Sequence, residues 1–345
     1  MLNSSYNKDD VIFLLKDLTN IMPSTSLEEK ERLIASGVNY SEMITDEEPV
    51  SNEINKVFEE MLQAEKANIA EYVGVIAEGI MKKTRSPILV SLARAGTPIG
   101  ILVKRYIKFK YGKVVPHYTI SIIRGKGIDT NALNYILEHE KDAKERIIFI
   151  DGWTGKKSIT HQLKESIEAF DPLISSDLVV LADPAKSSKL AGTREDVCIP
   201  NACLNSTVSG LTSRTICNEN YIGPNDFHGA KVYDYLASSD YSNFFLDEVE
   251  KEFTYRNKKI MLMQDQDYVE KVLDFITKKY NVSADKVKLS IGESSRALIR
   301  RKPKLILVND MTNPQLKFIL KMAKEKNVTV KEENLFDYAC VAILE

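Results

Sequence analysis

Uninterrupted apolar runs recur along the first half of the chain, and segments with helical spacing separate them. The helical segments begin at Pro98, Asn131 and Ser158. The apolar runs are PILVSLA (Pro87–Ala93), HYTISII (His117–Ile123), RIIFID (Arg146–Asp151) and DLVVLAD (Asp177–Asp183). Strands that are apolar throughout are buried on both faces, as in a parallel sheet covered by helices. The predicted fold class is therefore α/β, with ligands expected beyond the carboxyl ends of the strands.

The remaining segments predict two further helices, a long loop and a second domain. Asp9–Leu18 predicts a short amphipathic helix and Asn52–Met81 a long one, whereas residues 183–242 are polar and lack periodicity. A second strand–helix pattern begins at Lys258–Met263 and continues through Tyr268–Tyr280, KLILVND, a helix from Pro314 and VAILE. We therefore expect two domains, residues 1–255 and a smaller α/β domain of residues 256–345.

The composition is that of a globular, cytoplasmic protein. With 345 residues and 43% hydrophobic content, the chain can bury a core in each domain. No apolar run approaches the roughly 18 residues needed to span a bilayer, and MLNSSYNKDD lacks the order of a signal peptide, so we expect no membrane partner. The four cysteines have no CxxC spacing, which argues against a zinc knuckle or a disulfide scaffold and indicates reduced thiols.

Charge is distributed unevenly, although the net charge is only −2. From Arg256 onward, 18 Lys and Arg residues accompany 12 Asp and Glu residues, which leaves 29 and 37 for the rest of the chain. Such asymmetry favours a polyanion as the partner of the basic C-terminal part.

The end of the RIIFID strand carries residues suited to binding phosphate. Asp151 ends this strand, and the loop after it offers small residues, a helix start and two lysines, in the order Thr154, Gly155, Lys156, Lys157 and Ser158. Backbone N–H groups, the helix dipole and the lysine charges together favour a bound phosphate. The spacing is not that of the P-loop GxxxxGK[ST]. The alternative is an ordinary turn between a strand and a helix.

The ILVSLA strand ends in a similar way. Arg94 follows the strand, and Ala95, Gly96 and Thr97 lead into the next helix. An arginine at a strand end can bind pyrophosphate through two hydrogen bonds, while a glycine allows close approach of the backbone. The alternative is a helix initiated by Pro98 beside a solvated arginine.

Together these two strand ends resemble type I phosphoribosyltransferases. The resemblance implies that phosphoribosyl pyrophosphate, or a related ribonucleotide, binds between the two loops, and that Asp151 contacts the ribose hydroxyls and Mg²⁺. Arg94 and Asp151 would then be the catalytic residues of a phosphoribosyltransferase, with catalysis by positioning and charge stabilisation. Most members of that family have a second acidic residue where this chain has Gly152. That difference favours, as an alternative, a non-catalytic nucleotide sensor coupled to RNA.

A more specific resemblance covers nearly the first 250 residues. The segments FLLKDL, SLARAGTPIG, HYTISIIRGKGID, FIDGWTGKKSI, GTREDVCIPNACLNSTVSGLTSRT and GPNDFHGAKVY are similar to a phosphoribosyltransferase-like family of bacterial tellurite-resistance and stress gene clusters. Some members of this family are labelled cysteine protease StiP. The resemblance implies a bacterial tellurite or stress-response system.

The protease label suggests a third interpretation. Cys203 and His228 are candidates for a nucleophile and a base, with Asp226 or Asp240 orienting the imidazole. A buried structural cysteine and a loop histidine are the alternative. The polar residues of the same loop are candidates for a lid or a base-recognition surface: Arg194, Asn201, Asn205, Ser206, Thr207 and Ser209.

The basic C-terminal segment resembles the Pelota-type RNA-binding domain. The segment KLSIGESSRALIRRKPKLILVND has a helix start at Gly292 and Glu293, followed by a basic stripe of Arg296, Arg300, Arg301, Lys302 and Lys304. Basic side chains on one face bind phosphates, and a helix start can reach unpaired bases. The resemblance therefore implies binding of structured RNA. The alternative is a basic helix face exposed to solvent.

Overall fold

The first part of the chain is built around a parallel sheet. A computed structural model describes residues 1–255, 257 and 267–345. Within these residues the central sheet has six strands in the order β1-β4-β3-β7-β8-β9, and every neighbouring pair is parallel. The strands are β1 (Ile12–Phe13), β4 (His117–Ile120), β3 (Ile88–Leu92), β7 (Ile147–Trp153), β8 (Leu178–Ala182) and β9 (Leu190–Thr193). The parallel sheet expected from the apolar runs is confirmed.

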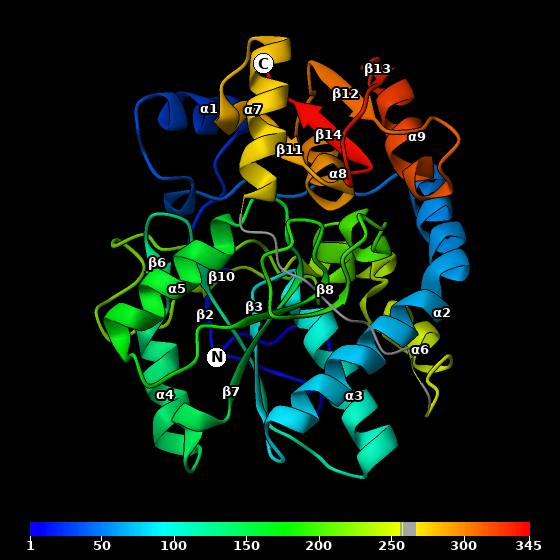
Figure 1. Cartoon of the computed structure of the whole chain (residues 1–345). Coiled ribbons are helices and arrows are strands. Elements are labelled where there is room, and N and C mark those ends of the chain that lie inside the picture. Colours follow the sequence, from blue (N-terminus) through cyan, green and yellow to red (C-terminus); the bar gives the residue numbers. More distant parts are fainter. Residues whose placement is uncertain (256, 258–266) are drawn as a thin grey trace.

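Helices cover both faces of this sheet (Figure 1). Successive residues of β7 enter different cores, since Ile148 and Ile150 pack on one side while Ile147 and Phe149 pack on the other. This explains why the strand is apolar throughout. One face carries α2 (Asn52–Lys83), α3 (Gly96–Tyr111) and α6 (Ser242–Glu250), and the other carries α4 (Thr130–His139) and α5 (Ser158–Phe170).

Shorter elements surround the sheet. The helix expected at Asp9–Leu18 is wrong, because this segment contains β1 and the short strand β2 (Lys16–Asp17). Leu14 and Leu15 are both fully buried but belong to cores on opposite sides, as extended backbone requires. The other short elements are α1 (Leu27–Ala35), β5 (Ile122–Ile123) paired antiparallel with β6 (Gly127–Ile128), and β10 (Gly229–Ala230) paired parallel with β2.

The C-terminal part has its own smaller sheet. Its order is β11-β14-β12-β13, with β12 and β13 parallel and the other pairs antiparallel. The strands are β11 (Val287–Leu289), β12 (Leu305–Val308), β13 (Thr329–Glu332) and β14 (Cys340–Ile343), and the helices are α7 (Tyr268–Tyr280), α8 (Ile291–Arg300) and α9 (Lys317–Glu325). The small α/β unit is thus confirmed, whereas the strand expected at Lys258–Met263 lies outside the described residues.

The two parts share a continuous apolar core. Buried residues of α8 and α9, such as Leu298 and Phe318, belong to the same cluster as those of α2 and α3. A buried carboxylate strengthens the junction, since Asp196 accepts hydrogen bonds from the backbone N–H groups of Ile291 (2.9 Å) and Ala339 (2.9 Å). Thus α8 is held against the first part at its N-terminal end (Figure 1).

Membrane spans, cellular location and the domain boundary are the remaining expectations about the chain as a whole. No helix in the described residues is both long enough and apolar enough to cross a bilayer. The expected cytoplasmic location stays a prediction. The expected boundary between residues 255 and 256 also stays a prediction, because residues 256 and 258–266 are not among those described.

Candidate active site and the boundary between the two parts

The carboxyl ends of three neighbouring strands bring the candidate residues to one edge of the central sheet. Arg94 follows β3, Ser121 follows β4, and Asp151 lies near the end of β7. The ends of β3 and β7 approach so closely that a Cβ at Gly96 would lie 2.3 Å from the carbonyl oxygen of Ile150. Sequence reasoning therefore placed Arg94 and Asp151 correctly on adjacent strand ends.

Arg94 is engaged by the protein's own groups. Its guanidinium pairs with Glu47 (2.7 Å), donates to the carbonyl oxygen of Thr212 (2.6 Å) and donates to Asn205 Oδ1 (3.1 Å). Burial opposes ionisation of Glu47, but Arg94 and Ser206 outweigh it and lower the pKa of this carboxyl. A guanidinium held in this way is not free to clasp pyrophosphate.

The expected phosphate loop is likewise occupied. Thr154 Oγ1 donates to Asp183 (2.5 Å), and Lys157 pairs with Glu270 of α7 (3.1 Å). Lys156 donates to the carbonyl oxygen of Ala284. Of the remaining predicted phosphate ligands, Ala95, Gly96 and Thr97 are at the start of α3, Ser158 opens α5, and the carbonyl oxygen of Gly155 accepts from Tyr338 (2.8 Å). The loop therefore serves as a contact surface for the C-terminal part.

Asp151 is a half-buried acid, and charged groups of the C-terminal part act on it electrostatically. Burial raises its pKa to about 6, against the effects of the Gly152 N–H and of Arg296. Its Oδ1 accepts the Gly152 N–H (2.7 Å). In the described part of the chain, no group of three or more His, Cys, Asp or Glu side chains could hold a metal ion, so Mg²⁺ at Asp151 remains a prediction.

The start of α8 lies against the end of β7. A Cβ at Gly292 would lie 2.4 Å from the indole of Trp153. Trp153 Nε1 donates to Glu293 (3.3 Å), and the guanidinium carbon of Arg296 lies 4.5 Å from the centre of the indole. The prediction that Gly292 and Glu293 form an open RNA-binding helix start is therefore wrong, because Trp153 covers them. Farther along, Arg300, Arg301, Lys302 and Lys304 remain exposed.

The expected pair of Cys203 and His228 is not supported by the contacts of either residue. Cys203 is 1% exposed, and its sulfur lies 3.8 Å from the sulfur of Cys198. The two acids expected to orient His228 have other partners, since Asp226 pairs with Lys16 (2.6 Å) and Asp240 accepts the backbone N–H of Ser242 (2.9 Å). The structure thus places Cys203 in the core.

Cys217 is the cysteine that lies beside His228. Ile216 and Gly229 exchange both backbone hydrogen bonds (2.8 Å each) in an antiparallel bridge. The next residues along the two segments are Cys217 and His228. Where an antiparallel pair continues, such residues stand opposite each other on one face, with Cα atoms typically about 4.5 to 5.5 Å apart. Both residues are half-buried. Sequence reasoning missed this pair.

Two polar residues fix the histidine. Nδ1 of His228 is 2.9 Å from Ser121 Oγ, and the His228 backbone N–H donates to the buried carboxylate of Asp129 (2.6 Å). Asp129 in turn caps α4 by accepting the Ala132 N–H (3.0 Å). A proton on Nδ1 that is donated to Ser121 leaves Nε2 able to act as a base.

The same charges surround both side chains of the pair. Burial lowers the pKa of His228, with Asp129 opposing and Lys126 reinforcing this effect. Burial raises the pKa of Cys217. Lys126 opposes this effect, whereas Asp129 reinforces it. At neutral pH the pair is therefore a neutral thiol beside a neutral imidazole.

The polar loop packs against the strand ends and does not form a separate lid. Asn205 contacts Arg94, and the Ser206 N–H donates to Glu47 (2.8 Å). Arg194 pairs with the buried Asp183. The other three candidates, Asn201, Thr207 and Ser209, are buried.

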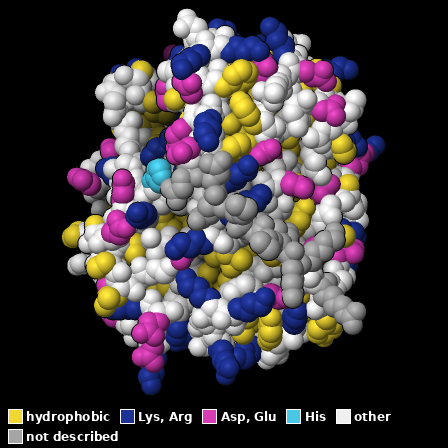
Figure 2. Space-filling model, in the orientation of Figure 1, with side chains coloured by type: hydrophobic (Ala, Val, Ile, Leu, Met, Phe, Trp, Pro, Cys, Tyr) yellow, Lys and Arg dark blue, Asp and Glu magenta, His cyan; other side chains and the backbone are white. Residues whose placement is uncertain are grey.

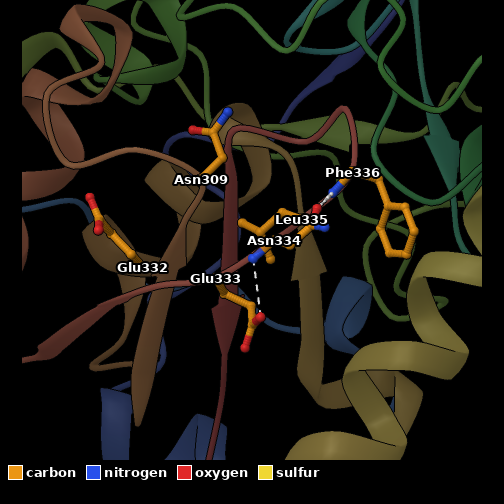
Figure 3. Close-up of a pocket in the computed structure, with 6 residues that line it drawn as sticks. All are labelled: Asn309, Glu332, Glu333, Asn334, Leu335 and Phe336. Carbon is orange, nitrogen blue, oxygen red and sulfur yellow. Dashed lines mark hydrogen bonds between the residues drawn. The ribbon is translucent and has the colours of Figure 1, made fainter.

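A pocket of about 480 Å³ lies elsewhere, on the C-terminal part (Figure 3). Its lining includes two glutamates and no Lys or Arg, which does not suit a polyanion. The lining residues are Asn309, Glu332, Glu333, Asn334, Leu335 and Phe336.

Two family models and one curated relative match this chain over most of its length. A family model described as "Tellurite-like stress resistance cysteine protease StiP" matches residues 4–250, and one described as "PELOTA RNA binding domain" matches residues 268–345. A curated relative, "Cysteine protease StiP" of Acinetobacter baylyi (strain ATCC 33305 / BD413 / ADP1), is 32% identical over 365 residues, which cover 99% of this chain and 94% of the relative.

These findings overturn the expected phosphoribosyltransferase activity. Both the family and the relative are named as cysteine proteases, and the groups assigned to phosphate binding are occupied by protein contacts. The resemblance at the strand ends concerned how the backbone is arranged, and fold similarity does not determine the reaction. The chain belongs to the tellurite-like stress resistance cysteine protease StiP family, and its StiP region is followed by a Pelota RNA-binding domain.

Proposed function

We propose that the protein is a cysteine protease in which Cys217 is the nucleophile and His228 is the general base. The bridge between Ile216 and Gly229 is the observation that supports this assignment, because Cys217 and His228 are the residues next to it on the two paired segments. The family description and the relative's name support the reaction class. Cys203, in contrast, lacks the exposure that a nucleophile needs.

The proposed reaction uses one proton carrier throughout. The thiol proton of Cys217 passes to Nε2 of His228 as the sulfur attacks the carbonyl carbon of a peptide bond. The imidazolium gives this proton to the departing amine, which leaves a thioester on Cys217. Water then loses a proton to His228, attacks the thioester and releases a carboxylic acid and the free thiol.

The polar neighbours have positioning roles in this scheme. Ser121 holds Nδ1, and the negative charge of Asp129 stabilises the imidazolium. No hydrogen bond joins Cys217 to His228 within the described residues, so a side-chain rotation must bring the sulfur and Nε2 together. Catalytic contacts in ligand-free sites often tighten only when substrate binds.

The test is hydrolysis of quenched fluorescent casein by the full chain. Cys217→Ala and His228→Ala should each lower the rate at least about 100-fold, whereas the core variant Cys203→Ala should keep most of the activity. The second measurement is the rate at which iodoacetamide alkylates Cys217, which should fall in His228→Ala whatever the substrate preference. Full casein hydrolysis by Cys217→Ala, or an unchanged alkylation rate in His228→Ala, would rule out the assignment.

We also propose that the C-terminal part binds RNA. The matched domain description and the exposed Arg300 and Arg301 support this second role. The type I phosphoribosyltransferase-like sheet plan is retained as a proposal about architecture alone, supported by Arg94 and Asp151 at neighbouring strand ends. Retarded migration of a labelled RNA hairpin in a native gel tests RNA binding, and no retardation at 50 mM salt would exclude it.

A further inference from the structure

Cations from both parts of the chain gather where α8 faces the first part. At the C-terminal end of α8, Arg300 and Arg301 are exposed, and their side chains have no hydrogen bond or ion pair to any of the described residues. In the first part, burial lowers the pKa of Lys30 of α1, and the charges of Arg300 and Arg301 add to this effect. Lys30 therefore belongs to the same region. Figure 1 shows α1 beside the C-terminal part, although the sequence separates them by more than 200 residues.

A second segment of the first part adds to this cluster. The turn at Arg124 is fixed by hydrogen bonds to residues 39 and 40, since the Arg124 N–H donates to Tyr40 (3.2 Å) and Asn39 donates to the Arg124 carbonyl oxygen (3.4 Å). The Arg124 side chain is exposed and has no hydrogen bond or ion pair within the part of the chain that the structure describes. The guanidinium of Arg214 donates to the carbonyl oxygen of Tyr40 and lies over the Tyr40 ring.

The acids in this region do not balance the cations. Glu47 already pairs with Arg94, and Glu293 accepts from Trp153. Glu31 acts on Lys30 and Asp285 acts on Lys156, but in each case less strongly than the neighbouring cations do. In Figure 2, Lys and Arg side chains lie among Asp and Glu side chains on the face that it shows.

The electrostatic consequence is mutual repulsion. The charges of Arg296 and Arg94 act against the charged form of Arg300. Burial, followed by Lys288 and Arg124, lowers the pKa of Lys156 to about 8. Such effects mean that nearby acids do not offset the positive charges of these side chains. An added polyanion would supply the missing negative charge.

We propose that RNA bound by this chain lies across the boundary between the two parts, where Lys30 and Arg124 of the first part and Arg300 and Arg301 at the C-terminal end of α8 together hold its phosphates. This inference rests on the RNA binding proposed above and extends the site beyond the Pelota domain. Because Trp153 covers Gly292 and Glu293, the site contacts the phosphate backbone and does not read bases at the helix start.

The location of this composite site relates RNA to the proposed protease site. Arg124 lies two residues before Lys126, which acts electrostatically on both Cys217 and His228. A phosphate near Arg124 would therefore also lie near the positive charge that lowers the pKa of Cys217. The composite site thus places the polyanion on the same carboxyl edge of the sheet as the thiol.

The experiment measures fluorescence anisotropy of a fluorescein-labelled 16-nucleotide RNA with the full chain at several salt concentrations. Lys30→Ala/Arg124→Ala and Arg300→Ala/Arg301→Ala should each weaken binding at least about tenfold and reduce the salt slope by about 1.4, or about 0.7 for each lost phosphate contact. Lys82→Ala/Arg85→Ala is the matched control, since it removes one exposed Lys and one exposed Arg near the end of α2.

The outcomes separate this inference from RNA binding itself. If Lys30→Ala/Arg124→Ala behaves like the control while Arg300→Ala/Arg301→Ala loses affinity, the Pelota domain binds RNA alone and the composite site is wrong. If the parent protein does not bind the RNA at 50 mM salt, both proposals fail. Equal thermal melting of all variants confirms that folding is intact.

Discussion

Gly292, the second residue of α8, lies directly on the indole of Trp153 at the end of β7. A Cβ at position 292 would approach Trp153 Nε1 to 2.4 Å. The contact joins residues 139 positions apart in the sequence and fixes how the C-terminal part sits on the strand ends. Because the indole is packed on one face by Arg296 and bonded to Glu293, it has little freedom to move away.

Adding one methyl group at this contact should destabilise the protein. Gly292→Ala should lower the free energy of unfolding by about 1 to 3 kcal/mol, the usual range for overpacking. Urea unfolding followed by circular dichroism measures this loss. The matched control is Gly223→Ala, whose added Cβ would meet only the end of the Asp226 side chain at 3.2 Å. Equal stability of the two variants would contradict the close packing at Trp153.

The buried pair of Arg94 and Glu47 should behave as a unit. Their side chains are 6% and 19% exposed, so Arg94→Met leaves a buried carboxylate without its cation. We expect a loss of about 3 to 5 kcal/mol in the free energy of unfolding, with partial recovery in Arg94→Met/Glu47→Gln. A double-mutant cycle in urea measures the coupling. Strict additivity of the two substitutions would show that the pair is not coupled.

His117 should make the protein sensitive to acid. Its ring is bonded to Ser91 Oγ (2.7 Å) and to the Asp10 carbonyl oxygen (2.9 Å), and burial lowers its pKa to about 3. The unfolded chain takes up a proton below about pH 6.5, which the folded chain refuses until about pH 3. The stability that neutral His117 provides is therefore complete above about pH 6.5 and is lost as the pH falls toward 3.

The acid effect is measured by urea unfolding at pH 4, 5, 6 and 7. His117 should contribute a decrease of up to roughly 1.4 kcal/mol per pH unit as the pH falls. His117→Gln should remove this contribution, whereas the exposed His161→Gln should not change it. The prediction fails if the parent and His117→Gln show the same dependence on pH.

The four cysteines should differ sharply in reactivity. Cys198, Cys203 and Cys340 are at most 1% exposed, while Cys217 is half-buried. We expect one fast thiol per chain with Ellman's reagent and three more after denaturation. Because burial raises the pKa of Cys217, the fast rate should still be rising at pH 9. A rate that is already constant at neutral pH would indicate a preformed thiolate instead.

The amino-acid sequence was sufficient to predict the fold where the local apolar pattern and the burial of the segment agree. The run Ile147–Ile150 is apolar because both of its faces are covered, and this predicted the parallel sheet and the adjacent strand ends. The pattern was misleading at Asp9–Leu18, where the two-residue strands β1 and β2 are too short to show alternation. The covering of Asp151 and Gly155 by the C-terminal part depends on contacts far apart in the sequence, which no local pattern encodes.

The candidate active site was missed for a related reason. The segments that carry Cys217 and His228 are joined by the single bridge between Ile216 and Gly229, and a bridge of one residue pair leaves no periodic signal. The available signal was the segment GPND at residues 223–226, whose turn-forming residues are typical of a chain reversal. A reversal there folds residues 217–228 back on themselves, which favours Cys217 over Cys203 as the neighbour of His228.

Trp153 is the only tryptophan among the 345 residues, and its position gives the protein a native optical reporter. The indole is 8% exposed and lies under Arg296 at the junction of the two parts. Its emission should therefore be blue-shifted in the intact protein and move to longer wavelength when the C-terminal part separates from β7. Any ligand, protein or nucleic acid that alters the seating of α8 can be followed by this single fluorophore, without a label.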